Sequence, residues 1–148
     1  MTISRHSAPE SKRSQMMRAV RQKNTSAERL VRGILQKLGV RFRVNHPGLP
    51  GHPDFANRAR GWAIFVHGCF WHGHRNCRKT RGGESGRVPA TNSEWWSEKL
   101  RSNRERDARK ELALRDAGLR VLTIWECELK DLSEVEARVR RFLDRPSE

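Results

Sequence analysis

A short stretch of this chain, residues 67–77, concentrates side chains that bind metals or transfer protons. It reads HGCFWHGHRNC and holds two of the three cysteines and three of the six histidines. Cys69, His74 and Cys77 have the close spacing of zinc ligands in proteins. Cys127 lies far downstream and could supply a fourth ligand. Because a site with four protein ligands is closed to substrate, the spacing predicts a structural zinc site.

The other side chains of this stretch remain available for different chemistry. His67 and His72 could transfer protons, because imidazole changes its charge near neutral pH. The sequence leaves open that either histidine binds the zinc instead, although four ligands are already at hand. Phe70 and Trp71 are of types that usually pack in a core, but here they lie in a polar segment with glycines on either side. These four residues are therefore candidates for a functional site.

The positive charge of the chain is concentrated in two segments. The net charge is +14, from 31 Lys and Arg against 17 Asp and Glu. Residues 1–43 hold eleven basic and two acidic side chains, and residues 75–110 hold eleven and five. Localised charge of this kind attracts a phosphate backbone through the release of counterions. The distribution favours a nucleic-acid partner over a merely soluble protein of high isoelectric point.

Length and composition limit the class of protein. At 148 residues the chain is expected to form a single domain with its own core. No apolar run is long enough to cross a membrane, and residues 1–12 lack the apolar stretch of a signal peptide. Three cysteines cannot all pair in disulfides, and two of them cluster with histidine. We therefore expect a protein of a reducing cytoplasm, without a membrane partner.

The hydrophobic pattern predicts an α/β protein. Residues 1–13 are small, polar and basic and are expected to form a flexible arm, with one domain over residues 14–148. In that domain the pattern predicts helices over residues 14–23, 25–39, 91–117 and 132–143, and strands over residues 40–44, 54–56, 62–66 and 120–125. Three strands followed by a helical crossover to a fourth strand imply a mixed β-sheet flanked by helices.

Two of the predicted helices open with the sequence of a capping box. Thr25 and Glu28 form one such pair, and Thr91 and Glu94 form the other. The apolar side chains expected to pack inward are Leu30, Ile34, Leu35 and Leu38 in the first helix, and Trp95, Leu100, Leu112 and Leu114 in the second.

Five segments of the chain together resemble a known family, the very-short-patch repair (Vsr) endonucleases. They read RSQMMRAV at residues 13–20, LPGHPDF at 49–55, FVHGCFWH at 65–72, VPAT at 88–91 and VLTIWEC at 121–127. The resemblance covers the chain from about residue 11 to residue 143. Members of this family are bacterial enzymes with a restriction-endonuclease-like fold. They nick DNA beside the thymine of a T:G mismatch, which arises when 5-methylcytosine deaminates.

The resemblance implies a Mg²⁺-dependent mismatch endonuclease with a structural zinc. Residues 14–148 would form one nuclease domain built on a restriction-endonuclease-like mixed sheet. The expected substrate is double-stranded DNA with a T:G mismatch, and the expected functional link is to a cytosine-5 DNA methyltransferase. The protein is expected to act on the bacterial nucleoid, in the cytoplasm, as a monomer.

The resemblance also implies roles in a catalytic centre. Asp54 would bind Mg²⁺, although an aspartate in such a place is by itself more often a turn residue. The backbone carbonyl of Val66 would be a second magnesium ligand. Val66 stands where the best-known members have threonine, so a role for that hydroxyl does not carry over. His72 would be the general base, and His67 would support the scissile phosphate or the leaving group.

Two further carboxylates occupy positions that match functional ones in the family. Glu28 is implied to be catalytic, although it also reads as a helix-capping residue together with Thr25. Asp107 is implied to orient a catalytic imidazole, although an aspartate on such a charged helix is commonly a solvated residue.

Aromatic and basic residues are implied to contact the DNA. Phe70 and Trp71 would wedge between base pairs at the mismatch, where the stack is weakest. Met17 would insert from the opposite groove, although it could equally be a packing residue. The phosphate backbone would be bound by Arg13, Arg18 and Arg21.

Two other functions fit the same composition. One is a non-catalytic, zinc-stabilised DNA-binding module, but such a module has no need of Asp54, His67 and His72 at one strand end. The other is a restriction-type or structure-specific DNA nuclease on the same fold. A neighbouring gene for a cytosine-5 methyltransferase would favour mismatch repair over that second alternative.

Overall fold

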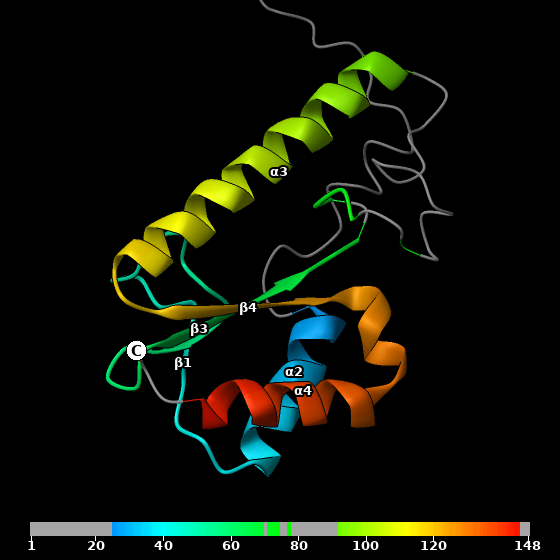
Figure 1. Cartoon of the computed structure of the whole chain (residues 1–148). Coiled ribbons are helices and arrows are strands. Elements are labelled where there is room, and N and C mark those ends of the chain that lie inside the picture. The colour runs from blue at the N-terminus through cyan, green and yellow to red at the C-terminus, as the bar shows by residue number, and fades with distance from the viewer. Residues whose placement is uncertain (1–24, 70, 75–76, 78–91, 146–148) are drawn as a thin grey trace, which may run out of the picture.

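The structure, a computed structural model, describes residues 25–69, 71–74, 77 and 92–145. These residues form a four-stranded sheet with helices on both faces (Figure 1). The predicted arm, residues 1–13, and the predicted helix over residues 14–23 lie outside them. No helix in the described part of the chain is long and apolar enough to cross a membrane. The predicted α/β class is confirmed.

The sheet joins its strands in chain order: β1 (Arg43–Val44), β2 (Phe55–Asn57), β3 (Trp62–His67) and β4 (Arg120–Trp125). β1 pairs with β2 and β2 with β3 in antiparallel fashion, whereas β3 and β4 are parallel. The parallel register places His67 opposite Trp125, so the chain leaves both strands at the same end of the sheet. The mixed sheet is as the sequence predicts.

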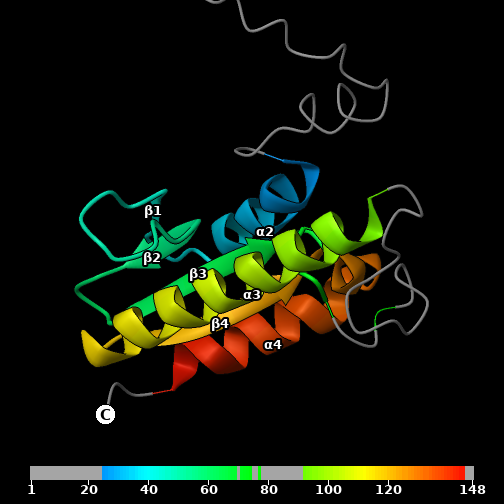
Figure 2. The ribbon, with the colours of Figure 1, turned by 90° about the horizontal axis from the view of Figure 1, so that it is seen from above.

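The helices of the described residues are α2 (Ser26–Lys37), α3 (Ser93–Asp116) and α4 (Leu132–Asp144), with a short 3₁₀ helix, η2 (Glu126–Lys130). Helix α3 crosses one face of the sheet, as the view from above shows (Figure 2). Helices α2 and α4 lie on the opposite face (Figure 1). The core on the α2 and α4 side contains Val31, Ile34, Leu35, Phe55, Trp62, Ile64, Val66, Ile124, Leu129, Val135 and Val139. The core on the α3 side contains Leu49, Ala56, Ala63, Phe65, Leu114, Leu119 and Val121.

Helix α2 begins where the sequence predicts because Thr25 caps it. The Thr25 Oγ1 accepts a hydrogen bond of 3.2 Å from the backbone N–H of Glu28. Val31, Ile34 and Leu35 are buried against the sheet. Leu30, which the pattern places on this face, is 43% exposed. Successive residues are rotated by about 100° around the helix axis, so the next residue, Val31, occupies the inward position instead.

The end of α2 differs from the prediction because a capping motif uses the next residues. Gly39 takes a positive φ of 70°, and its N–H donates to the carbonyl of Gln36. The N–H of Val40 donates to the carbonyl of Leu35, which completes a Schellman motif. Val40 is therefore part of the helix terminus, and the strand predicted over residues 40–44 is only the two-residue β1.

Helix α3 has a start and a buried face that differ from the prediction. Asn92 precedes it at a φ of 58° without a side-chain cap, so the helix begins at Ser93, one residue later than the predicted capping box requires, and Thr91 of that box lies outside the described residues. Leu100 and Leu114 are buried as expected, seven residues on either side of Asp107. Two helical turns separate such positions, so all three share one face. The other two residues expected to pack inward lie off this face and are exposed, Trp95 by 58% and Leu112 by 59%.

Candidate active site and metal centre

The loop after β3 folds as a tight turn against α3. The N–H of His72 donates to the carbonyl of Gly68, and the N–H of His74 donates to the carbonyl of Cys69 at 2.9 Å. Gly73 takes a φ of 58°, which favours glycine. A Cβ at Gly73 would lie 2.8 Å from the Nη1 of Arg104 on α3, so this flexible side chain would have to shift to admit another residue. The turn presents Cys69 and His74 to one group of side chains and His72 to another.

Four predicted ligands converge into one candidate metal centre. The ligand atoms of Cys69, His74, Cys77 and Cys127 all lie within 4.8 Å of one another. Cys127 reaches the group because η2 follows β4 directly, at the sheet end where the loop after β3 also begins. Its N–H donates to the Cys69 sulfur at 3.4 Å, and its own sulfur lies 3.5 Å from the His74 Nδ1.

The chemistry of this group fits a bound cation. Cys69 and Cys77 are almost fully buried. Burial raises the pKa of the Cys69 thiol to about 12, and burial also raises the pKa of Cys127. The raised pKa values keep the thiols of Cys69 and Cys127 protonated without a metal, whereas a divalent cation would deprotonate the thiols and bind all four groups. Three sulfurs and one nitrogen are a donor set that suits Zn²⁺.

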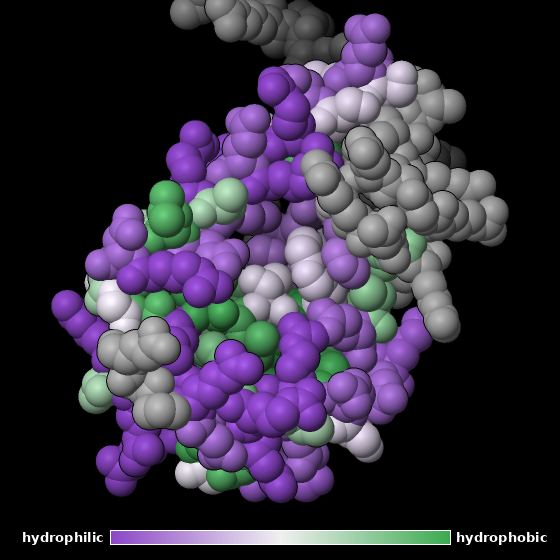
Figure 3. Space-filling model, in the orientation of Figure 1, coloured by the Kyte–Doolittle hydropathy of each residue, from purple (hydrophilic) through white to green (hydrophobic). Residues whose placement is uncertain are grey.

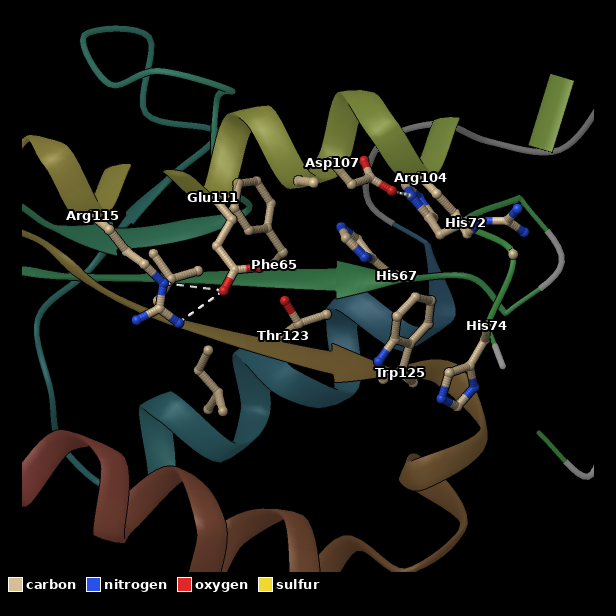
Figure 4. Close-up of a pocket in the computed structure, with 14 residues that line it drawn as sticks. Phe65, His67, His72, His74, Arg104, Asp107, Glu111, Arg115, Thr123 and Trp125 are labelled. Carbon is tan, nitrogen blue, oxygen red and sulfur yellow. Dashed lines mark hydrogen bonds and ion pairs between the residues drawn. The ribbon is translucent and has the colours of Figure 1, made fainter. Parts of the chain in front are cut away.

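The two remaining histidines of the loop form a separate pair with Asp107. Their imidazole rings are stacked, with centroids 3.8 Å apart and an interplanar angle of 5°. The Nδ1 of His72 lies 2.6 Å from the Oδ2 of Asp107, which reaches it from α3 (Figure 4). His67 and His72 thus group with this carboxylate, whereas the cysteines group with His74. The hydrogen bond with Asp107 also leaves the Nε2 of His72 as the nitrogen able to accept a proton.

His67 is a buried imidazole with an unused nitrogen. It is 8% exposed, and its Nδ1 has no hydrogen-bond partner among the residues that the structure describes. Burial, followed by the charge of neighbouring His72, lowers the pKa of His67 to about 3. His67 is therefore neutral near physiological pH and can offer either a donor or an acceptor to a bound molecule.

Asp54 lies beside the end of β3, across from the histidine pair. Its Oδ2 accepts a hydrogen bond of 2.7 Å from the backbone N–H of Val66. Burial is the main reason that the pKa of Asp54 is raised to about 7, and the negative charge of Glu28 adds to it. Glu28 is itself 7% exposed. Two carboxylates in such surroundings fit a divalent cation, which would offset their charge.

All five predicted catalytic side chains line one cleft. Its volume is about 810 Å³, and Asp54, Glu28, His67, His72 and Asp107 all border it. The cleft is also lined by Val66, by Trp71, and by polar and basic side chains that include Lys99, Asn103, Arg106, Lys110 and Lys130. The sequence predictions thus name residues from separate segments that the fold brings to one place.

Trp125 is a neighbour of the site that sequence reasoning missed. Its indole stacks on the His74 imidazole, with centroids 4.1 Å apart, and meets His67 edge-on at 5.1 Å (Figure 4). It therefore stands between the metal centre and the histidine pair. In the sequence, Trp125 is marked only by its position two residues before Cys127. Its position opposite His67 follows from the β3–β4 register.

A second hollow lies on the outer side of the histidine pair. Its volume is about 560 Å³, and His67, His72 and Asp107 line it as they line the cleft. Apolar side chains gather in a hollow below α3, over β4, with the charged groups of Glu111 and Arg115 at the pocket's other end (Figures 3 and 4).

The predicted DNA contacts are only partly within the structure. Trp71 lines the cleft, its carbonyl accepts a hydrogen bond of 2.8 Å from Asn103, and its ring lies 6.1 Å from that of Trp96. Five predicted contacts lie outside the described residues: Phe70, Met17, Arg13, Arg18 and Arg21.

Comparison with known proteins places the chain among DNA endonucleases. The family model described as DNA mismatch endonuclease Vsr matches residues 7–79. The type II nicking enzyme V.XorIIP of Xanthomonas oryzae pv. oryzae is 47% identical over 133 residues, which cover 90% of this chain and 93% of that protein. The DNA mismatch endonuclease Vsr of Escherichia coli is 42% identical over 118 residues, 80% of this chain and 71% of that protein. The chain belongs to the Vsr family.

Membership agrees with the resemblance seen in the sequence and extends over nearly the whole chain. The type II nicking enzyme V.NmeAIP of Neisseria meningitidis is 38% identical over 133 residues, 90% of each protein. This Vsr-family protein is a DNA endonuclease. A DNA endonuclease has to bind a DNA strand and hydrolyse a phosphodiester bond.

The pairing of His72 with Asp107 leads to a first prediction for this Vsr-family enzyme. Asp107→Asn would leave the side-chain shape but remove the charge that fixes the His72 tautomer. We expect the single-turnover nicking rate to fall by about 10²- to 10⁴-fold. Glu111→Gln, one helical turn further along α3, is the matched control, because Glu111 pairs with Arg115 and does not line the cleft. Equal rates for the two variants would make Asp107 an ordinary solvated helix residue.

Proposed function

We propose that this endonuclease nicks one strand of double-stranded DNA beside the thymine of a T:G mismatch, in a reaction that requires Mg²⁺. The observation that supports this most directly is the single cleft in which a carboxylate pair, Asp54 and Glu28, faces a histidine paired with a carboxylate, His72 and Asp107. A cation site and a proton acceptor side by side are what metal-assisted phosphodiester hydrolysis needs. The printed names of the relatives, mismatch endonuclease and nicking enzyme, support the same reaction.

The magnesium would be held by Asp54, with Glu28 nearby and the carbonyl of Val66 as a further ligand. Bound Mg²⁺ would polarise the scissile phosphate and offset the charge of the transition state. The hydrogen bond from the Val66 N–H fixes one oxygen of Asp54 and leaves the other free for the cation. The raised pKa of Asp54, about 7, reflects the burial that a cation at this place would compensate.

The histidine pair would carry out the proton transfer. The Nε2 of His72 would take a proton from the attacking water, while the Asp107 carboxylate stabilises the imidazolium that forms. The water oxygen bonds to phosphorus as the bond from phosphorus to the leaving sugar oxygen breaks. His67 stays neutral because its pKa is lowered to about 3, so it would hydrogen-bond to the phosphate or the leaving oxygen.

Selectivity for the mismatch would come from two aromatic residues, of which Trp71 lines the cleft. Phe70 and Trp71 would enter the base stack at the mismatch, where unstacking costs least. Met17 would enter from the opposite groove, and Arg13, Arg18 and Arg21 of the basic segment would bind phosphates. Residues 1–13 would serve as the arm, and residues 14–148 as one nuclease domain of the restriction-endonuclease-like kind.

The remaining parts of the proposal concern the second metal and the setting. Zn²⁺ at Cys69, His74, Cys77 and Cys127 would be structural, because the protein fills all four positions. The enzyme would act as a monomer in the cytoplasm, on lesions produced where a cytosine-5 DNA methyltransferase has modified DNA.

Nicking of a labelled duplex with one T:G mismatch tests this function. We expect a single nick on the thymine strand, in the presence of Mg²⁺ and not of EDTA, and no cutting of the matched T:A duplex. The T:G mismatch should be placed in several flanking sequences, because base-edge contacts set the context. Cutting of matched DNA would instead indicate a restriction-type nuclease. Binding without a nick in every context would indicate a non-catalytic module.

A further inference from the structure

We propose that Lys110, on α3, is a further catalytic residue whose ammonium group binds the scissile phosphate and stabilises the charge that develops on it. The inference rests on the proposed active site around Asp54. It adds to that site a cation which the protein itself supplies.

The position of Lys110 on α3 directs it to the cleft. It follows Asp107 by three residues, so both side chains project from the same side of the helix. Lys110 and Asp107 both line the cleft together with Asp54 and His67. One helix would therefore supply the carboxylate that orients the base and the cation that faces the phosphate.

The stem of Lys110 is held in place by Gly51. A Cβ built on Gly51 would lie 2.7 Å from the Cβ of Lys110, 2.8 Å from its Cγ and 3.0 Å from its Cδ. The lysine methylenes thus pass directly over the backbone of the loop that leads into Asp54. Gly51 also has a φ of 74°, a conformation that other residues adopt only with strain. Such contact limits the rotamers of Lys110 and orients its ammonium beforehand.

Lys110 borders the same cleft as the Asp54 carboxylate and the His67 imidazole. A phosphate bound between these two groups would lie beside it.

The chemistry calls for such a cation, and β3 does not provide one. The strand end beside Asp54 consists of Ile64, Phe65 and Val66, which carry no positive charge. Hydrolysis of a phosphodiester builds negative charge on the phosphoryl and leaving oxygens, and a positioned ammonium in the cleft would stabilise that charge. Lys110 would supply that positive charge from α3.

Single-turnover nicking with saturating enzyme tests the proposal, on a duplex that the native protein cuts. Lys110→Met keeps the stem over Gly51 and removes the charge. We expect its rate constant to fall by about 10²- to 10³-fold, with the DNA Kd changed by less than about fivefold. Lys110→Arg should recover part of the rate. The control is Arg109→Met, which removes the same charge from an exposed neighbour that does not line the cleft, and its rate should stay within about twofold of the native rate.

The outcomes separate this inference from the proposed site. A Lys110→Met rate within about threefold of the native rate overturns the role in chemistry, and a weakened Kd beside it would make Lys110 a simple DNA-binding residue. If Asp54→Asn also nicks normally, the proposed site itself is wrong. If Asp54→Asn is inactive and Lys110→Met is active, only the lysine is wrongly assigned. Circular dichroism and the melting temperature verify folding, and Lys110→Gln replaces Lys110→Met if that variant does not fold.

Discussion

Asp54→Asn is expected to lower the nicking rate by at least about 10³-fold, because the amide cannot replace a carboxylate that holds a divalent cation. Binding to the DNA substrate should be nearly unchanged, since the substitution removes a negative charge from a cleft that faces phosphates. The measurement is a single-turnover rate together with a Kd from the same protein preparation. Retained nicking would remove Asp54 from the metal site.

The same substitution should stabilise the metal-free protein near neutral pH. In the folded protein the pKa of Asp54 is raised from 3.8 to about 7, chiefly by burial. Between these two values the folded state holds a proton that the unfolded chain has lost. The stability that this group contributes is therefore full below the ordinary value and is lost as the pH rises through 7. Asp54→Asn has no such loss.

Melting curves with and without Mg²⁺ check this linkage. At about pH 8 and without metal, Asp54→Asn should melt above the native protein, whereas at about pH 4 the two should agree more closely. Mg²⁺ should raise the native melting temperature more at the higher pH, because only the ionised carboxylate binds it. Asp116→Asn, which removes an exposed carboxylate at the end of α3, is the matched control. An identical pH dependence in native protein and Asp54→Asn would mean that Asp54 does not titrate as described.

Cys127→Ser is expected to lower metal content and thermal stability together. A buried site that loses one of four ligands leaves two thiols and an imidazole without their cation. A destabilisation of about 4 kcal/mol would lower the melting temperature by roughly 8–16 °C. Metal content by mass spectrometry and a thermal melt are the two readouts. Full occupancy with an unchanged melting temperature would place the fourth ligand elsewhere.

A conservative variant distinguishes loss of a ligand from loss of packing. Cys127→His retains a donor of the kind that zinc accepts, so it should recover part of the metal content that Cys127→Ser loses. Cys127→Ala should behave like Cys127→Ser, although it keeps a small apolar side chain. If the alanine variant instead kept its metal, the Cys127 sulfur would be a packing group rather than a ligand.

Most of what depends on local pattern can be predicted from the sequence. The apolar runs of β3 and β4, the Thr25 cap of α2 and the spacing of the metal ligands all follow from short-range chemistry, and the structure contains each of them. The pairing of His72 with Asp107 is different, because 35 residues separate them. It is implied only by resemblance to a family, since no spacing rule links a loop to a helix so far away.

The predictions that failed depended on how elements meet in space. Helix α3 is so rich in charge that its periodicity hardly distinguishes one face from another, so the pattern places both Leu112 and Leu114 inward although only Leu114 is buried. Asn92 adopts a left-handed conformation, which asparagine tolerates but which the sequence pattern does not predict at this position. The contact of Lys110 with Gly51 and the place of Trp125 likewise need tertiary packing, which is fixed only when α3 and β4 dock on β3.

The position of the metal centre has a consequence for folding kinetics. Parallel strands can pair only after a long crossover has closed, and that closure is slow because it brings together segments distant in sequence. Three of the four ligands follow β3 and the fourth follows β4, so a complete site exists only once the two strands are in register. A metal bound there should act after the rate-limiting step. It would slow unfolding far more than it speeds folding, and so give the protein a long lifetime rather than a fast assembly.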